Sequence, residues 1–231
     1  MTYTSFVRKT MQATPAEEPA TLFSLANLCH TAVVVSVIAL LFPVLVNPGE
    51  WVFFTWHPAL MSAGTVGLMS EGIILTAGLK TKRRSFYLNV HLLLQLLSLI
   101  AVLAAFTVIY VNKNLAGKLH FQTWHSWVSL GATVLMGLQN LTGLVLYFFS
   151  FLSRGCDGKR KAAIKKNLAK FHRYSAVVAY IGALAAVGFG LRSNWALKNY
   201  GSDRATYMVL SLVVFTGASV LYNLSFLRKL I

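Results

Sequence analysis

Charged side chains are scarce in this sequence, and acidic ones are nearly missing. Only 12% of the 231 residues are charged and 56% are hydrophobic, with six acidic residues against 21 lysines and arginines. Soluble globular domains carry roughly 25% charged residues. The composition therefore excludes an ordinary soluble domain and favours an integral membrane protein.

Cysteine is nearly absent as well. The two cysteines, Cys29 and Cys156, fall in different predicted elements, so the sequence indicates no disulfide framework. It also lacks the C-x-x-C-H motif, through which haem is attached covalently. Any haem in this protein must therefore be held by ligation and packing alone.

Long apolar runs take the place of these missing features. A hydrocarbon core of about 30 Å requires about 20 apolar residues per helix. Six stretches reach this length: 24–46, 57–79, 87–111, 125–150, 171–191 and 205–227. A helix satisfies its own backbone hydrogen bonds in lipid. We therefore predict an all-α membrane protein, with a six-helix transmembrane bundle over residues 21–231 and a mobile cytosolic tail over residues 1–20.

The net charge of +15 resembles that of a nucleic-acid-binding protein until its distribution is considered. Fifteen lysines and arginines fall in the two termini and the even-numbered loops, five fall in the odd-numbered loops, and Arg173 opens the fifth stretch. The positive-inside rule then predicts that both termini are cytosolic. The charge is accounted for by topology and by attraction to lipid headgroups, so we expect no nucleic-acid partner.

Four histidines, one near an end of each of four successive stretches, are the candidate functional residues: His57, His91, His125 and His172. A histidine in hydrocarbon is costly, so it indicates a function by default. Neighbouring helices run in opposite directions. His57 and His125 are therefore expected to share the extracytosolic level, and His91 and His172 the cytosolic level.

Two histidines at each of two levels match two haems, each with a pair of imidazole ligands to its iron. Two non-covalent b haems within the central four helices would carry electrons across the membrane. A divalent-metal transporter is the main alternative, although a metal site favours ligands that converge at one depth. A non-catalytic helical scaffold is the third.

Three further polar residues lie in or near the predicted helices. We expect His30 to be packed or hydrogen-bonded, because no histidine remains to pair with it. His120 belongs either to the membrane interface or to an extracytosolic substrate site. Glu71 lies only about 40° from the face of His57 on a helical projection, and we expect it to be a hydrogen-bond partner near a haem.

The motifs around these residues resemble those of the cytochrome b561 family over residues 20–227. The matching positions are Trp56-His57-Pro58, Glu71, His91, His125-Ser126-Trp127, Gln139 and His172. The resemblance implies a transmembrane ascorbate-dependent oxidoreductase, usually a homodimer, in which His91 and His172 hold one haem and His57 and His125 the other. Cytosolic ascorbate would be the electron donor, and monodehydroascorbate or ferric iron the acceptor.

The cytosolic donor site departs from the better-known branches of that family. Where those branches carry a Tyr-Arg pair after the second-helix carboxylate, this chain has Ala77 and Gly78. Basic residues nearby are candidates to bind ascorbate instead: Lys80, Lys82, Arg83, Arg84, Lys170 and Arg173. Details of the motifs are most similar to an intracellular-membrane branch, which implies residence in the endoplasmic reticulum or in vesicles.

Overall fold

Helices and short connecting segments make up the residues that the computed structural model describes, 25–46, 52–76, 81–153 and 157–224. The helices are α2 Leu25–Val46, η2 Phe53–Thr55, α3 Trp56–Met61, η3 Ser62–Met69, α4 Ser70–Ile74, α5 Arg84–Leu115, α6 Trp124–Tyr147, α7 Phe149–Leu152, α8 Gly158–Leu191, α9 Asn194–Tyr200 and α10 Asp203–Asn223. The predicted tail, residues 1–20, lies outside the described ranges.

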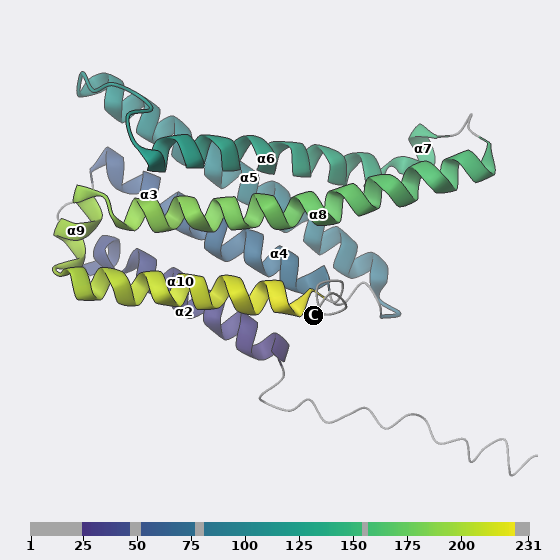
Figure 1. The fold of residues 1–231 in the computed structure, drawn as a ribbon, viewed down its shortest axis with the longest axis horizontal. Coiled ribbons are helices and arrows are strands. Elements are labelled where there is room, and N and C mark those ends of the chain that lie inside the picture. Colours follow the sequence, from purple (N-terminus) through teal and green to yellow (C-terminus); the bar gives the residue numbers. More distant parts are fainter. Residues whose placement is uncertain (1–24, 47–51, 77–80, 154–156, 225–231) are drawn as a thin grey trace, which may run out of the picture.

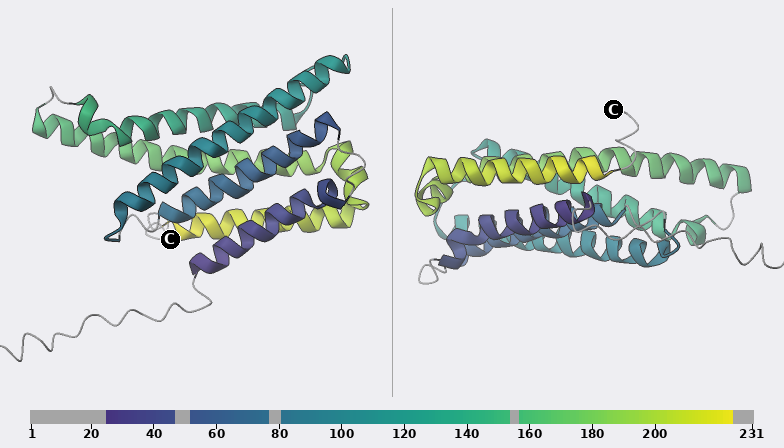
Figure 2. Two further views of the ribbon diagram at one scale, coloured as in Figure 1. Left: turned by 180° about the vertical axis from the view of Figure 1, so that it is seen from behind. Right: turned by 90° about the horizontal axis from the view of Figure 1, so that it is seen from below.

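Five of these helices are long and apolar enough to cross a membrane: α2, α5, α6, α8 and α10. They run along the long axis of the molecule, with α2 beside α10 and α6 beside α8 (Figure 1, Figure 2). Many large apolar side chains on their outer faces are exposed, as expected for helices that contact lipid. The chain is thus a multi-pass, all-helical membrane protein, as the apolar runs predict. We name the two ends of the bundle after the short helices there, the α9 end and the α7 end.

The second predicted stretch, 57–79, is not one regular α-helix. The chain is helical over Trp56–Met61, Ser62–Met69 and Ser70–Ile74, but the middle piece, η3, is wound as a π-helix. The hydroxyl groups of Ser62 and Thr65 donate to backbone carbonyls one turn earlier. This widened segment packs against α5, where Ser98 Oγ donates to the carbonyl of Gly64 at 2.6 Å.

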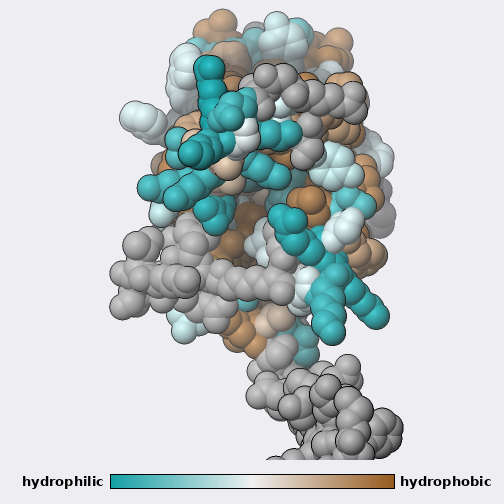
Figure 3. Space-filling model, turned by 90° about the vertical axis from the view of Figure 1, so that its right-hand side faces the viewer, coloured by the Kyte–Doolittle hydropathy of each residue, from teal (hydrophilic) through white to brown (hydrophobic). Residues whose placement is uncertain are grey.

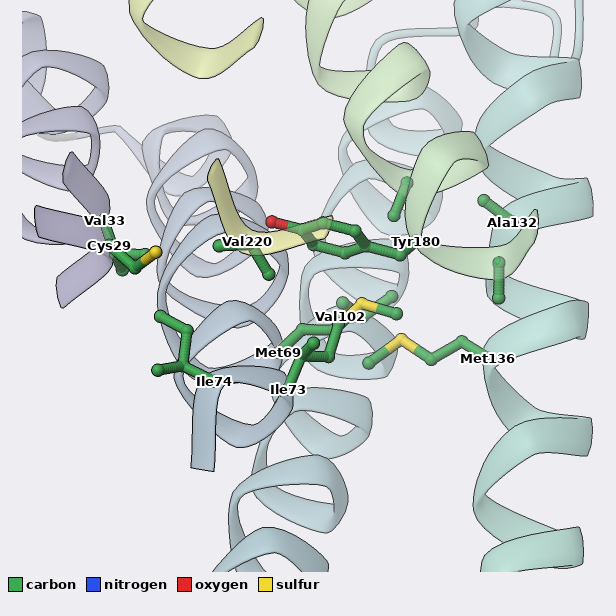
Figure 4. Packing of buried hydrophobic residues seen from close by; sticks show 12 residues of the cluster. Cys29, Val33, Met69, Ile73, Ile74, Val102, Ala132, Met136, Tyr180 and Val220 are labelled. Carbon is green, nitrogen blue, oxygen red and sulfur yellow. The ribbon is translucent and has the colours of Figure 1, made fainter. Parts of the chain in front are cut away.

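The core lies at mid-height in the bundle, where the largest fully buried side chain is Tyr180 of α8. Its hydroxyl lies 2.7 Å from Ser70 Oγ, so a hydrogen bond joins α8 to α4. Met69 and Met136 pack near the Tyr180 ring (Figure 4). A buried phenol requires a hydrogen-bond partner, and this one therefore fixes the height of α8 relative to the second stretch.

Helix α9 closes one end of the bundle. Ser193 caps its start, and Gly201, with a φ of 76°, ends it in the left-handed conformation that glycine adopts easily. The Tyr200 hydroxyl donates to the carbonyl of Leu40 at 3.0 Å. Burial raises the pKa of Tyr200 to about 12, so its proton remains available for that hydrogen bond at physiological pH.

The close approach at Gly64 makes a testable prediction. A Cβ at this position would lie 3.2 Å from Ala101 Cβ and 3.3 Å from the Ser98 carbonyl oxygen. Gly64→Val should therefore destabilise the protein by about 1–3 kcal/mol, as overpacking usually does. Thermal unfolding in detergent measures the loss. Gly67→Val is the matched control, because its nearest neighbour is 3.5 Å away. Equal melting temperatures for the two variants would contradict the packing described.

Candidate functional site

His57 and His125 meet near the α9 end. Their ring centres are 6.3 Å apart, and the ring planes are inclined by 85°. An imidazole nitrogen lies about 2.0–2.1 Å from a bound metal ion and about 1.1 Å from its own ring centre. Two imidazoles that bind opposite sides of one metal ion therefore have ring centres roughly 6.3 Å apart. The spacing of this pair therefore matches that of two ligands on one metal ion.

Both rings are oriented by hydrogen bonds to neighbouring helices. His57 Nδ1 lies 3.0 Å from the carbonyl of Ala105 in α5, and His125 Nδ1 lies 2.9 Å from the carbonyl of Ala186 in α8. A carbonyl oxygen only accepts, so each Nδ1 carries the proton. Each Nε2 then keeps a free lone pair, which is the state that a metal ligand needs.

His91 and His172 lie toward the α7 end and have comparable support. His91 Nδ1 donates to the carbonyl of Gly72 at 2.7 Å. His172 Nδ1 lies 3.1 Å from the Thr142 hydroxyl, which donates its own proton to the carbonyl of Gln139. The side-chain amide of Gln139 lies 3.0 Å from the same His172 Nδ1, so this nitrogen has polar partners on α6.

The hydrogen bonds divide the four elements into two reciprocal pairs. The second stretch and α5 exchange one bond at each level, and α6 and α8 do the same. Along α8, His172 is separated by fourteen residues from the carbonyl of Ala186, or about 21 Å in an α-helix. The histidines that face each other as candidate ligands come from different pairs. A ligand between them would bridge the two halves of the bundle.

A cavity of about 330 Å³ opens between these halves at the His57 and His125 level. Its lining is mainly apolar, with Val102, Phe106 and Leu130 among the contributors. Glycine leaves room beside the candidate ligands, since a Cβ on Gly190 would lie 3.1 Å from His125 Cε1. At the other level, a Cβ on Gly143 would lie 3.4 Å from His172 Cε1.

The donor set fits a flat apolar cofactor that carries a metal better than it fits a bare metal ion. Imidazoles in pairs suit the two axial positions of haem iron, and the apolar lining suits a porphyrin. In the described part of the chain, no three side chains of histidine, cysteine, aspartate or glutamate come together as a metal site. A divalent-metal transporter would need such convergence, so the geometry favours haem.

Comparison with known proteins agrees with this chemistry. Residues 56–197, which contain all four histidines, match the family described as eukaryotic cytochrome b561. The chain belongs to the cytochrome b561 family. Cytochromes are haem proteins, so membership implies a haem cofactor.

Several members of the cytochrome b561 family are similar over most of the chain. The bovine transmembrane reductase CYB561D2 is 31% identical over 66% of this chain and 66% of its own length. The mouse protein of the same name is 28% identical over 79% of each chain. The Arabidopsis thaliana transmembrane ascorbate ferrireductase 1 is 28% identical over 65% of this chain and 62% of its own length.

His30 and Glu71, two further polar residues noted in the sequence, pair with each other and not with the candidate haem ligands. His30 is hydrogen-bonded, as predicted, with Nδ1 2.5 Å from Glu71 Oε2. Glu71 therefore pairs with α2, and it also precedes Gly72, whose carbonyl orients His91. The pair ties α2 to the second stretch at the level of the cytochrome's α7-end histidines.

His120 lies at the rim of the cavity. Its neighbours there were not predicted from the sequence as site residues. Its ring stacks on Tyr110 with 4.3 Å between ring centres, and its Nε2 lies 2.7 Å from Asn114 Oδ1. Lys113 also lines the cavity and interacts electrostatically with both His57 and His125. In the sequence, Lys113 is marked only by its position, as the first cation after the apolar run 87–111.

The candidate donor residues lie at the α7 end. Arg83, Arg84, Lys170 and Arg173 are all exposed there, and hydrophilic side chains gather over this end of the molecule (Figure 3). Lys80, together with Ala77 and Gly78, lies outside the described residues.

Blocking the glycine gap should remove haem from the α9-end site. Gly190→Val places a Cβ 3.1 Å from His125 Cε1, and its methyl groups add to the crowding, so the ring must shift from its present position. We expect haem absorbance per protein to fall markedly, while the amount of folded protein is maintained. Gly137→Val on α6 is the matched control, because no atom lies within 4 Å of a Cβ there. Equal haem content in the two variants would contradict this placement of the cofactor.

Proposed function

We propose that the chain is a transmembrane ascorbate-dependent oxidoreductase that contains two b haems. It would oxidise cytosolic ascorbate and reduce monodehydroascorbate or ferric iron on the other side. The observation that carries this proposal is the arrangement of four histidines at two depths, each with Nδ1 hydrogen-bonded. In the three whose partner is a carbonyl, Nδ1 holds the proton and Nε2 is left available. Relatives named for ascorbate-specific electron transport, in maize, and for ascorbate ferrireduction, in Arabidopsis thaliana, support the choice of substrates.

His57 and His125 would hold one haem, and His91 and His172 the other. Haem, when bound, supplies reversible one-electron chemistry at its iron. The chain's own residues orient the ligands. Carbonyls of Ala105, Ala186 and Gly72 and the hydroxyl of Thr142 fix the imidazole planes. Because the three carbonyls accept the Nδ1 protons, they also increase the basicity of the ligating nitrogens.

The proposed topology has six membrane spans, with the α7 end and both termini in the cytosol. Five of the spans would be the long helices. The remaining one would be the second predicted stretch, which would cross as α3, η3 and α4 in succession. The concentration of lysine and arginine at the α7 end supports this orientation. Residues 21–231 would form this membrane domain. Homodimerisation, and residence in the endoplasmic reticulum or vesicles, are proposed by analogy with the family.

At the cytosolic end, the basic residues would bind the donor. Ascorbate is an anion at neutral pH, and a positively charged rim raises the local concentration of an anionic substrate. Arg83 and Arg84 open α5, which carries His91, while Lys170 and Arg173 flank His172. These cations would therefore hold ascorbate beside the cytosolic pair of histidines, with Lys80 contributing from the preceding segment.

At the other end, His120 and Lys113 would form the acceptor site. Lys113 lines the same cavity as the His57 and His125 pair, and His120 is held at its rim by Tyr110 and Asn114. A cation and a stacked aromatic pair suit a planar anion such as monodehydroascorbate, or ferric iron as an anionic chelate. The electron would thus leave from the His57 and His125 level, which lies beside this acceptor site.

Substituting the histidines one at a time tests the ligand assignment. His91→Ala and His172→Ala should each remove the haem that ascorbate reduces first, while His57→Ala and His125→Ala should leave that reduction intact. Reduced-minus-oxidised absorption spectra after addition of ascorbate separate the two classes. His30→Ala is the control, because His30 pairs with Glu71, and it should retain both haems. Retention of both haems by all four variants would refute the assignment.

Removing the cation at the acceptor site should weaken anionic acceptors selectively. Lys113→Gln is expected to raise KM for monodehydroascorbate or ferric citrate by about tenfold or more, since a hydrogen bond to a charged group contributes about 1.5–3 kcal/mol. The rate of haem reduction by ascorbate should not change. Stopped-flow reoxidation of the reduced protein measures the first effect. Lys198→Gln, an exposed cation at the same end, serves as the control.

A further inference from the structure

The first part of α8 projects beyond the membrane. The helix has 34 residues, so it is about 51 Å long, whereas the hydrocarbon core is about 30 Å thick. The two histidine levels give the depth, because His172 and the Ala186 carbonyl are about 21 Å apart along α8. If a bilayer is centred between them, the hydrocarbon boundary lies about 5 Å beyond His172.

Three lysines of this projecting part lie in and just beyond the headgroup layer. Lys161, Lys165 and Lys166 precede His172 by six to eleven residues, which places them about 4–12 Å outside the hydrocarbon boundary. The headgroup region on each side is about 5–8 Å thick. Their charges therefore face lipid phosphates rather than hydrocarbon or bulk solvent alone.

Helix α7 provides an apolar surface at the same height. Lys165 Nζ lies 6.0 Å from the centre of the Phe149 ring, so α7 packs beside this part of α8. Three large apolar side chains next to it are more than half exposed: Phe148 at 51%, Phe151 at 61% and Leu152 at 61%. Aromatic and apolar side chains at headgroup height anchor a protein in the membrane interface.

The lysines have no carboxylate partners among the described residues. The single ion pair found there joins His30 to Glu71. Asp157, the acidic residue nearest in sequence, caps α8 by accepting from the backbone amides of Lys159 and Arg160. The lysine charges at this height are therefore not paired with carboxylates of the described protein and are free to bind anionic groups of the membrane.

From these observations we propose that α7 and the start of α8 form a binding surface for anionic phospholipids. The surface consists of Phe148, Phe151, Leu152, Lys161, Lys165 and Lys166. The lysines bind headgroup phosphates and carboxylates, and the apolar side chains insert between the acyl chains. Adjacent cations and exposed apolar groups favour a lipid over a soluble anion, which would use the cations alone. This surface is distinct from the electron-transfer site.

Native mass spectrometry of the full-length protein in detergent tests the proposal. The protein is titrated with phosphatidylserine and, separately, with phosphatidylcholine, and the bound lipids are counted. We expect a preference for phosphatidylserine. Lys161→Gln/Lys165→Gln/Lys166→Gln should reduce that preference at least tenfold, because each cation near a membrane surface contributes on the order of fivefold. Circular dichroism and the elution volume verify folding.

The matched control removes three exposed cations at the α9 end, as Lys118→Gln/Lys198→Gln/Arg204→Gln. It should change the preference less than twofold. A second arm adds soluble glycerophosphoserine, which carries the same headgroup without acyl chains and should not displace the lipid at equal concentration. Wild-type preference in the triple lysine variant, an equal loss in the control, or efficient displacement by the soluble headgroup would each overturn the proposal.

Discussion

The arrangement depends on one interaction, the hydrogen bond between each histidine Nδ1 and a partner on a neighbouring helix. Without it an imidazole could rotate or present its protonated nitrogen to the cavity. The partners come from the same elements that carry the other histidines, so each of the four elements supplies a candidate ligand at one level and a hydrogen-bond partner at the other. A rotation of one helix would therefore change the position of a histidine at one level and of a hydrogen-bond partner at the other.

The layer between the two levels keeps this coupling rigid. Tyr180 and Ser70 hydrogen-bond across the core, and Ser98 bonds to the carbonyl of Gly64. In the membrane, helices associate through close packing and interhelical hydrogen bonds rather than through the hydrophobic effect. Buried serine and tyrosine groups therefore contribute specificity of height and rotation. The π-helical segment lies between His57 and Gly72 on the second stretch, so its winding sets the rotation of these two residues relative to each other.

The sequence predicted the helices that are long enough to cross the membrane, because contact with lipid requires a long run of apolar residues. The bounds of α2, α5, α6 and α10 agree with the apolar runs to within four residues. It did not predict that α8 begins at Gly158, because a helix outside the bilayer needs no apolar run. The π-helical winding also escaped prediction, since it depends on contact with α5. The four histidines were identifiable from their cost in hydrocarbon, but three of their acceptors are backbone carbonyls, which sequence patterns do not reveal. Lys113 was missed because a single cation beside an apolar run usually marks the membrane interface.

In the proposed arrangement, imidazoles from opposite halves of the bundle share one iron at each level. Low-temperature electron paramagnetic resonance of the oxidised, haem-loaded protein tests it most directly, because the spin state of ferric haem reports how many strong axial ligands the iron has. The account predicts two low-spin ferric signals and no high-spin component. A high-spin, five-coordinate signal of comparable intensity, or a single low-spin species in a fully loaded sample, would contradict it.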